Sequence, residues 1–125
     1  MNNLDKSDII KFRQKYRSIG SIKCPAFSGE QVFFDRTGFN HLIRKGRKLR
    51  KSDEQIDRLE LLSFAPYIIH VSKSFYGHRK VRDKVNPEKL IKFWSIVRYG
   101  LLDRKITVIV RQSGNGKKEF YSIFI

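Results

Sequence analysis

Two strand-like segments near the C-terminus, joined by a turn sequence, constrain the fold more than any other feature of the chain. Residues 106–110 read ITVIV and residues 119–125 read EFYSIFI, and β-branched and aromatic residues of this kind are enriched in strands. Between them, the sequence SGNG at 113–116 supplies glycine and asparagine, which tolerate the positive φ angles of a hairpin connection. The sequence therefore predicts a β-hairpin, and with it a sheet, in the C-terminal part of the chain.

Helical patterns dominate the first half of the chain instead. Ser7 or Asp8 can cap a first helix that Gly20 ends, and residues 52–55, SDEQ, have the form of a capping box. Apolar residues at nearly helical spacing follow that box as far as Pro66, which predicts a second helix. Helices followed by strands are typical of an α+β fold, and 125 residues correspond to a single domain.

The remaining segments give weaker signals. Residues 31–35 predict a short strand, residues 67–72 (YIIHVS) a buried strand, and residues 73–85 an irregular basic stretch. Asn86-Pro87 has the form of a helix start, whereas the aromatic and β-branched residues after it fit a strand. We expect one turn of helix there, followed by a strand over residues 92–99.

The expected architecture is therefore α+β, with N-terminal helices packed on a C-terminal antiparallel β-meander. Residues 1–125 form the single domain, in which residues 1–30 supply an N-terminal helix and loop and residues 31–125 the core. The N-terminal residues do not predict a secretory signal. No stretch approaches the roughly 18 apolar residues of a membrane span.

The charge of the chain indicates an anionic partner. There are 27 Lys and Arg against 12 Asp and Glu, which gives a net charge of +15. Such an excess attracts polyanions, and nucleic acid is favoured over a membrane surface because the basic residues are not gathered on one amphipathic helix. We expect no cofactor and no metal, since Cys24 is the only cysteine and the three histidines lack zinc-site spacing.

The segment at residues 33–51 combines this charge with a histidine. It reads FFDRTGFNHLIRKGRKLRK, a short apolar run followed by a turn and a helix-like stretch that Gly46 divides in two. Its cations can hold a polyanion by the phosphates, and His41 can move a proton near neutral pH. A solvated basic helix with a structural histidine is the alternative interpretation. The RNA-binding candidates of the segment are Lys45, Arg47, Lys48, Arg50 and Lys51.

The order of these features resembles the barnase, EndoU, colicin D and RelE group of small ribonuclease toxins, known as the BECR fold, in its phage-associated and polymorphic-toxin branch. There a strand leads into a helix with an Hxx[RK]-like motif, a second helix ends near a proline, and an antiparallel sheet follows. The matching segments are residues 33–47, 52–69, 106–112 and 119–125, so the likeness covers residues 31–125. It implies a barnase-like fold and ribonuclease activity.

The resemblance also implies site residues. Colicin D-like nucleases pair a histidine and lysines of the helical region with a Ser-x-aromatic sequence on a late strand. His41 with Lys45 or Lys48 matches the first part, and residues 122–124 (SIF) match the second. The sequence departs from the pattern at Phe124, where those nucleases carry tryptophan, so the identity of this strand residue differs from the family's.

Cleavage of RNA without a metal requires a base for the 2′-hydroxyl, an acid for the leaving 5′-oxygen and cations for the charge that builds on phosphorus. His41 is the candidate base or acid, and on a continuous helix Arg44 would lie one turn away and hold the phosphate. Arg111 is a second candidate clamp, although it can equally shield a sheet edge. Ser122 or Tyr121 is a candidate for positioning the phosphate or a base, although both also fit ordinary strand positions.

A second histidine, His78, is the alternative catalytic candidate because it lies in a basic stretch, FYGHRK, where a loop is expected. Near it, Tyr76 can stack on an unpaired base, and Arg79 and Lys80 can contact phosphates. Other residues are expected in the core, namely His70, Trp94, Tyr121 and Phe124.

The sequence thus predicts a toxin ribonuclease that cleaves RNA, with tRNA as the expected substrate, by metal-independent acid–base catalysis that leaves a 2′,3′-cyclic phosphate. A non-catalytic RNA- or DNA-binding module is the alternative. An active ribonuclease poisons the cell that makes it, so we expect an acidic immunity or antitoxin protein that covers residues 41–51, guided by opposite charge. The expected place of action is the cytoplasm of a target cell, with a phage-encoded protein and a C-terminal toxin domain of a larger secreted protein, as in contact-dependent growth inhibition, both open as origins.

Overall fold

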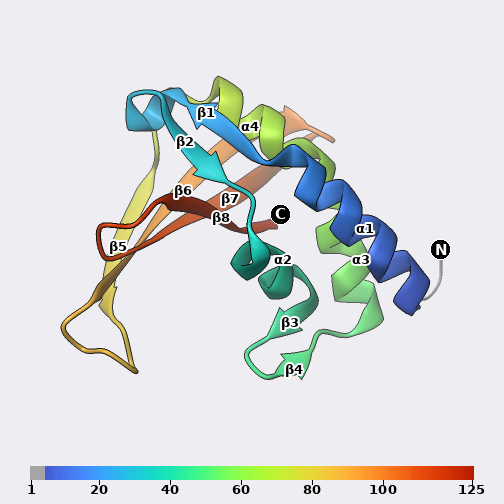
Figure 1. Cartoon of the computed structure of the whole chain (residues 1–125). Coiled ribbons are helices and arrows are strands. Elements are labelled where there is room, and N and C mark those ends of the chain that lie inside the picture. Colours follow the sequence, from blue (N-terminus) through green and yellow to red (C-terminus); the bar gives the residue numbers. More distant parts are fainter. Residues whose placement is uncertain (1–4) are drawn as a thin grey trace.

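A computed structural model, which describes residues 5–125, has an α+β fold with its helices mostly in the N-terminal half (Figure 1). No helix within these residues is long and apolar enough to cross a membrane. The helical elements are α1 (Lys6–Ile19), the 3₁₀ turn η1 (Pro25–Phe27), α2 (Arg36–Ile43), α3 (Ser52–Leu61), the 3₁₀ turn η2 (Leu62–Phe64) and α4 (Ala65–Val71).

A six-stranded sheet forms the other layer, with strand order β1-β2-β8-β7-β6-β5. Only the short β2–β8 pair is parallel, and β6, β7 and β8 form an antiparallel meander at the C-terminal end. The predicted α+β class, with helices on a C-terminal meander, is confirmed at this level. The strands are β1 (Ser21–Cys24), β2 (Glu30–Phe33), β5 (Gly77–Arg82), β6 (Leu90–Leu101), β7 (Arg104–Ser113) and β8 (Lys118–Phe124), and β3 (Arg44–Lys45) and β4 (Lys48–Leu49) form a separate hairpin.

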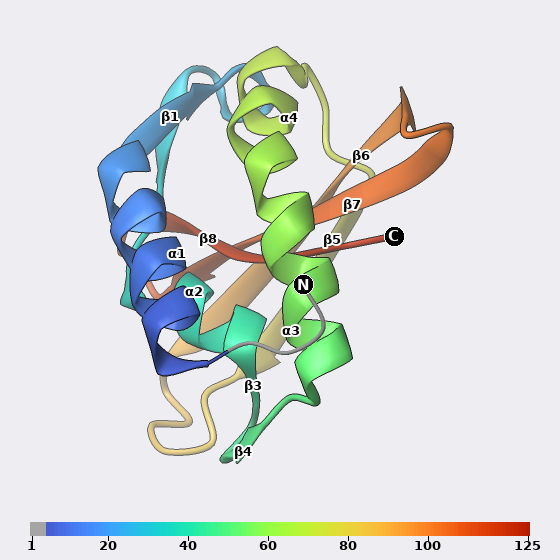
Figure 2. The same ribbon diagram turned by 90° about the vertical axis from the view of Figure 1, so that its right-hand side faces the viewer.

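The core lies between the helices and one face of this sheet. In Figure 2, α1 and the helical run from α3 to α4 lie in front of the strands of the meander. Along β7, side chains alternate between the two faces, so that Val108 and Val110 are fully buried on the helix side while Ile109 points to the other face. Trp94 is buried as expected, whereas Phe124 is exposed and the prediction of a core position for it was wrong.

Helices α1 and α3 begin differently from the sequence-based expectation. Asp5 caps α1: its side chain accepts a hydrogen bond from the Asp8 amide, and the Asp8 side chain accepts one from the Asp5 amide. Gly20 ends that helix at φ 69°, as predicted. The predicted capping box of α3 does not form, because the side chain of Gln55 is buried and donates instead to the carbonyl of Ile43 at 3.0 Å.

The strand predicted for residues 67–72 is a helix. Pro66 lies in the first turn of α4, where a missing amide proton costs nothing, and the helix continues directly from η2. Ile68 and Ile69 are buried, whereas His70 is exposed, so the prediction of a core histidine was wrong. An apolar run this short fits a buried helix as well as a strand.

The turn of helix expected at Asn86-Pro87 is also absent. These residues lie in the connection before β6, whose twelve residues pair with β7 over nearly its whole length. Residues of the stretch predicted to be irregular form β5, because they pair with the edge of β6 that β7 leaves free. Long-range strand pairing therefore overrides the local helix-start signal.

The basic segment is not one helix, contrary to the prediction. Helix α2 ends at Ile43, and Arg44 already has extended backbone angles of φ −127° and ψ 151°. Gly46, at φ 65°, then turns the chain into the β3–β4 hairpin. Arg44 is consequently not one helical turn from His41, and the phosphate-holding role that depended on that geometry has no support.

Helix α2 approaches the sheet at Gly38. A Cβ atom added at Gly38 would lie 2.6 Å from the Tyr16 hydroxyl and in still closer contact with the Phe120 carbonyl oxygen. The Tyr16 hydroxyl donates a hydrogen bond of 2.6 Å to the carbonyl of Asp35, immediately before the helix. Glycine at this position is therefore required by the packing of α2 against β8.

We predict that Gly38→Ala destabilises the protein by about 3 kcal/mol, because a methyl group forced into a packed contact between helix and strand has no room. Unfolding in denaturant measures the change. The neighbouring exposed variant Thr37→Ala is the control and is expected within about 0.5 kcal/mol of the parent. A Gly38→Ala protein as stable as the parent would contradict the close approach of α2 to β8.

Candidate active site

Helix α2 covers the part of β8 that β2 leaves unpaired. The β2–β8 pairing stops at Phe33 and Glu119, and α2 begins three residues after Phe33. Gly38 lies against the carbonyl of Phe120 on the next residue of β8. A helix that covers a strand edge in this way protects its unpaired backbone groups, and here it also brings His41 to the face of the sheet opposite the core.

A β-bulge in β8 places two consecutive side chains toward that face. Val110 pairs with Phe120 and Ile109 pairs with Ser122, so Tyr121 is the extra residue. Bulges redirect side chains and are frequent beside active sites. Phe120 is buried in the core, whereas Tyr121 and Ser122 both line a cleft of about 650 Å³ on the opposite face.

A row of mostly small residues forms the floor of this cleft, hereafter called the catalytic cleft for the role proposed for it below. Gly77 pairs with Ser95, Ser95 with Ile109, and Ile109 with Ser122, so one row of paired residues crosses four strands. Larger side chains surround the row. The other residues that line the cleft are His41, Arg58, His78, Arg79, Phe93, Tyr121 and Phe124.

His41 is held over this floor by two contacts. Its ring stacks on Tyr121 with ring centroids 4.1 Å apart and planes 22° apart. Arg50, at the end of the β3–β4 hairpin, donates from Nε to the His41 carbonyl at 3.0 Å and places Nη2 3.5 Å from His41 Nε2. A guanidinium can only donate, so this contact is compatible with an unprotonated Nε2.

The surroundings keep the His41 ring neutral. Burial, and after it the positive charges of Arg50 and Arg58, together lower the pKa of His41 from 6.5 to about 4. The imidazole is therefore unprotonated at neutral pH. A neutral histidine beside two fixed cations can accept a proton, and the cations are placed to attract a phosphate.

Arg58 is the site residue that the sequence analysis missed. It extends from α3, and its Nη1 donates to Ser122 Oγ at 2.7 Å, across 64 positions of sequence. The bond fixes a buried serine and a half-buried guanidinium at one point of the catalytic cleft. Nothing local marks Arg58, because it occupies an ordinary polar position on an amphipathic helix.

Of the basic residues predicted to contact RNA, Arg50 differs from the others. Its side chain is 5% exposed, forms an ion pair with Glu54 at 3.5 Å and supports His41 from behind. The remaining members of the hairpin region present their charges to solvent. These exposed residues are Lys45, Arg47, Lys48 and Lys51.

The second histidine candidate has a different orientation. The ring of His78 stacks on Trp94, with centroids 5.2 Å apart and planes 4° apart, and Trp94 belongs to the core face of β6. Alternation along β5 puts Arg79, rather than the His78 ring, on the face of Phe93, and the Arg79 guanidinium lies 5.0 Å from the Phe93 ring. This geometry favours His41 over His78 as the proton-transfer group. Tyr76 and Lys80 are exposed at either side of this pair.

Arg111 lies beside the cleft rather than in its lining. Its Nη1 forms an ion pair of 2.5 Å with Glu119, and its guanidinium carbon lies 5.9 Å from the Tyr121 ring centre. Burial first, and then neighbouring Asp35, raise the pKa of Glu119 from 4.5 to about 7, against the opposing effect of Arg111. The guanidinium of Arg111 is thus engaged by Glu119 and lies beside Tyr121, which favours a supporting role behind that ring.

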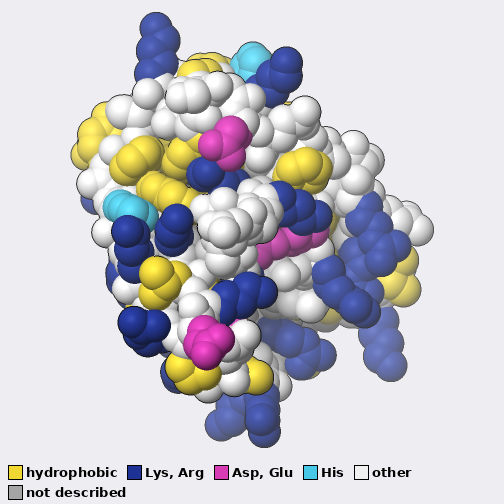
Figure 3. Space-filling model, turned by 60° about the vertical axis from the view of Figure 1, so that its left-hand side comes forward, with side chains coloured by type: hydrophobic (Ala, Val, Ile, Leu, Met, Phe, Trp, Pro, Cys, Tyr) yellow, Lys and Arg dark blue, Asp and Glu magenta, His cyan; other side chains and the backbone are white. Residues whose placement is uncertain are grey.

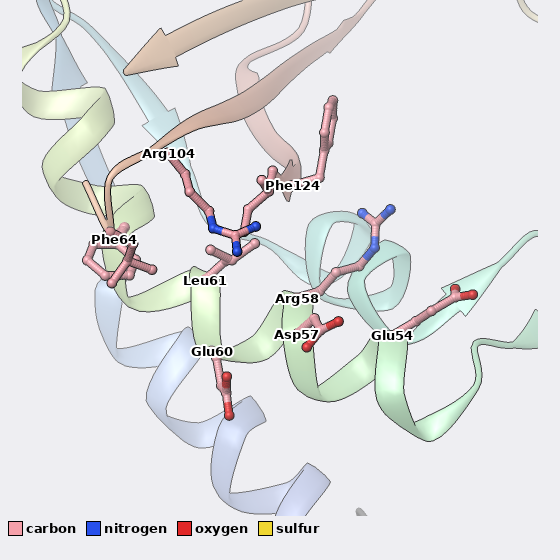
Figure 4. A pocket seen from close by; sticks show the side chains of 10 residues that line it. Glu54, Asp57, Arg58, Glu60, Leu61, Phe64, Arg104 and Phe124 are labelled. Atoms are coloured by element: carbon pink, nitrogen blue, oxygen red, sulfur yellow. The ribbon is translucent and has the colours of Figure 1, made fainter. Parts of the chain in front are cut away.

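A neighbouring cavity of about 670 Å³ shares Arg58 and Phe124 with the catalytic cleft. Figure 4 shows Leu61 and Phe64 at its apolar side, with Glu54, Asp57 and Glu60 along α3. These carboxylates are local exceptions on a basic protein.

Lysines and arginines are spread over much of the protein surface, and Figure 3 shows one face on which acidic side chains are few. Two pairs of lysines stand directly opposite each other across strands, Lys45 with Lys48 and Lys80 with Lys92. Like charges in such positions are destabilising. Concentrations of positive charge of this kind attract anions.

Comparison with protein-family models, with curated proteins and with solved structures gave no match for this chain. Within residues 5–125, no group of three or more His, Cys, Asp or Glu side chains lies close enough together to hold a metal ion.

We predict that Arg58→Met raises the pKa of His41 above about 4, because it removes one of the two cations that disfavour the imidazolium. The pKa should stay below 6.5, since burial is the larger cause. Titration of the imidazole signals by NMR measures it. Arg79→Met removes a charge that lines the same cleft but does not perturb His41, and is the control. An unchanged pKa in Arg58→Met, with α2 intact, would contradict the assigned geometry.

Proposed function

We propose that this protein is an endoribonuclease that cleaves RNA by acid–base catalysis without a metal ion. The observation that supports it is the convergence of His41, Arg58 and Ser122 in one cleft, although they come from α2, α3 and β8. A protein that only binds nucleic acid needs surface charge, but it does not need a neutral, half-buried histidine beside two arginines.

In the proposed reaction, neutral His41 takes the proton of a ribose 2′-hydroxyl, and the 2′-oxygen attacks phosphorus. The bond from phosphorus to the 5′-oxygen breaks, a 2′,3′-cyclic phosphate forms, and the leaving 5′-oxygen takes a proton from water, while His41 later returns its proton to the solvent. Arg58 stabilises the charge that builds on the phosphate oxygens, and Ser122 holds its guanidinium in place. The approach of an anionic phosphate offsets the two arginines, so that substrate binding itself makes His41 a stronger base.

Aromatic side chains around the cleft fit an RNA substrate with unpaired bases. Phe93, Tyr121 and Phe124 line the cleft beside the cations, and stacking on such rings is worth about 1–3 kcal/mol per base. The exposed basic hairpin of β3 and β4 adds phosphate contacts next to His41. A structured RNA with an accessible loop, with tRNA as the first choice, suits this combination.

The site supports the resemblance to the BECR group of ribonuclease toxins. The histidine after the first core strand and the Ser-x-aromatic of the last strand line the same cleft, as that resemblance implies. The helical motif is altered, because the chain leaves the helix at Ile43 before its basic residues. Barnase-like fold membership and a toxin role are part of the proposal for this reason.

A toxin of this kind needs an inhibitor in the cell that makes it. We include an acidic immunity or antitoxin protein that covers the catalytic cleft and the β3–β4 hairpin, because carboxylates can occupy the positions of phosphates there. The target-cell cytoplasm is the corresponding place of action. Hydrogen exchange on the complex should show protection at residues 41–51, and protection confined to α1 would exclude this partner site.

A non-catalytic RNA- or DNA-binding module is the second candidate. The opposed lysine pairs of β3–β4 and of β5–β6 favour it, since they need only an anionic partner and no chemistry. It differs from the first candidate in one observable: such a module binds RNA and leaves it intact.

We predict that the purified protein cleaves RNA in the presence of EDTA and leaves 2′,3′-cyclic phosphate ends, and that His41→Ala lowers the rate by roughly 10²- to 10⁴-fold because the base is lost. Sequencing of the new ends and gel kinetics measure both. His70→Ala, a change at an exposed histidine of α4, is the control and should retain full activity.

Full activity in His41→Ala, or a strict requirement for a divalent cation, would overturn the mechanism. An inactive His78→Ala with an active His41→Ala would move the proton-transfer role to β5. Tight binding without cleavage by the parent protein would favour the binding module.

A further inference from the structure

A second groove, of about 440 Å³, lies between α1 and α2 and gathers four arginines. Arg13 and Arg17 come from α1, Arg36 from the first turn of α2, and Arg44 from the residue after that helix. Hereafter it is called the arginine groove. It shares no lining residue with the catalytic cleft.

The arginines of this groove have no acidic partners. Among residues 5–125, none of the four forms an ion pair with a carboxylate. Asp35 is the acidic residue in the lining, but its Oδ2 lies 3.7 Å from Lys117, and Glu119 lies beside it. Four cations held around one hollow repel one another, and an anion bound between them would remove that repulsion.

The local structure places these side chains around the same groove. Arg13 and Arg17 are four residues apart on α1, and so share one helical face. Arg13 lies over the ring of Phe39, with its guanidinium carbon 5.2 Å from the ring centre. Asn40, four residues after Arg36 on α2, adds an amide to the lining. Planar guanidinium groups bind phosphate oxygens in pairs.

Helix α2 connects the arginine groove to the catalytic cleft. Asn40 lines the groove and His41, the next residue, lines the cleft. The two sites therefore lie on two sides of one helix, whose diameter with side chains is about 10–12 Å. An extended polyanion that enters the cleft can pass over α2 into the groove.

We propose that the arginine groove binds phosphates of the substrate RNA at a distance from the bond that is cleaved. That the bound RNA is also the substrate rests on the proposed function, but the binding of RNA phosphates to the groove does not. RNA is favoured over an acidic protein because the groove continues the path of the strand past His41, and because guanidinium groups without fixed partners match a row of phosphates. The groove would make the enzyme prefer long or structured RNA to short oligonucleotides.

The test compares two double variants of α1 and α2 that lose the same charge. Arg17→Ala/Arg36→Ala removes two exposed groove arginines, and Lys11→Ala/Lys15→Ala removes two exposed lysines of α1 that do not line the groove. Binding is measured in the His41→Ala background, so that it does not depend on cleavage. The probes are tRNA, a dinucleotide, inorganic phosphate as competitor, and poly-L-glutamate.

The groove variant should bind tRNA about tenfold more weakly or worse, because two charge-assisted contacts are lost. The negative slope of log affinity against log salt should become shallower by about 1.4, because each phosphate contact on a single strand contributes about 0.7. Its cleavage of the dinucleotide, in the His41 form, should be unchanged. The lysine variant should match the parent protein in all three measurements.

Equal loss in the two variants would overturn the inference, since only overall charge would then matter. It would also fail if tRNA binding were unchanged while poly-L-glutamate binding fell, which would assign the groove to an acidic protein. Competition by inorganic phosphate alone, without a difference for tRNA, would reduce the groove to a site for free phosphate. If the parent protein cleaves no RNA, but the groove variant binds tRNA more weakly than the lysine variant does, the proposed function fails and this inference stands.

Discussion

The close packing of α2 against β8 is the contact on which the candidate site depends. Gly38 lets the helix approach the Phe120 carbonyl, and Tyr16 fixes the start of that helix by its hydrogen bond to the Asp35 carbonyl. Because β2 pairs with only the first residues of β8, the helix can lie along the rest of that strand. One turn later it carries His41 onto the ring of Tyr121, which the bulge in β8 presents to the opposite face.

His41 and Glu119 make the stability of the fold depend on pH, and their contributions change in opposite directions as pH rises. The folded pKa of His41, about 4, lies below its unfolded value of 6.5, so the fold loses stability as pH falls from 6.5 toward 4. The folded pKa of Glu119, about 7, lies above its unfolded value of 4.5, so the stability that it contributes is present below pH 4.5 and is lost as pH rises through 7. Both groups are held in a less charged form than they have in water, which is common at functional sites.

Local patterns predicted the elements whose stability is local. The hairpin around residues 113–116 and the end of α1 at Gly20 depend on turn and cap residues that can be read directly. The segment at 67–72 and the strand β5 could not be assigned, because their conformations depend on partners far away in sequence. Within the site, residue type made His41 a candidate and the resemblance made Ser122 one, whereas the Arg58–Ser122 bond and the support of His41 by Arg50 arise only from the fold.

The central claim is that the catalytic cleft receives a phosphodiester beside a neutral His41. The most direct measurement is the pKa of His41, by NMR, in the free protein and in complex with a short 2′-O-methyl RNA, which binds as RNA does but lacks the attacking hydroxyl. The structure predicts a pKa of about 4 in the free protein. It predicts a clear rise in the complex, because the phosphate offsets the charges of Arg50 and Arg58. A pKa that stays the same when the RNA is fully bound would show that the phosphate binds elsewhere and would contradict the account.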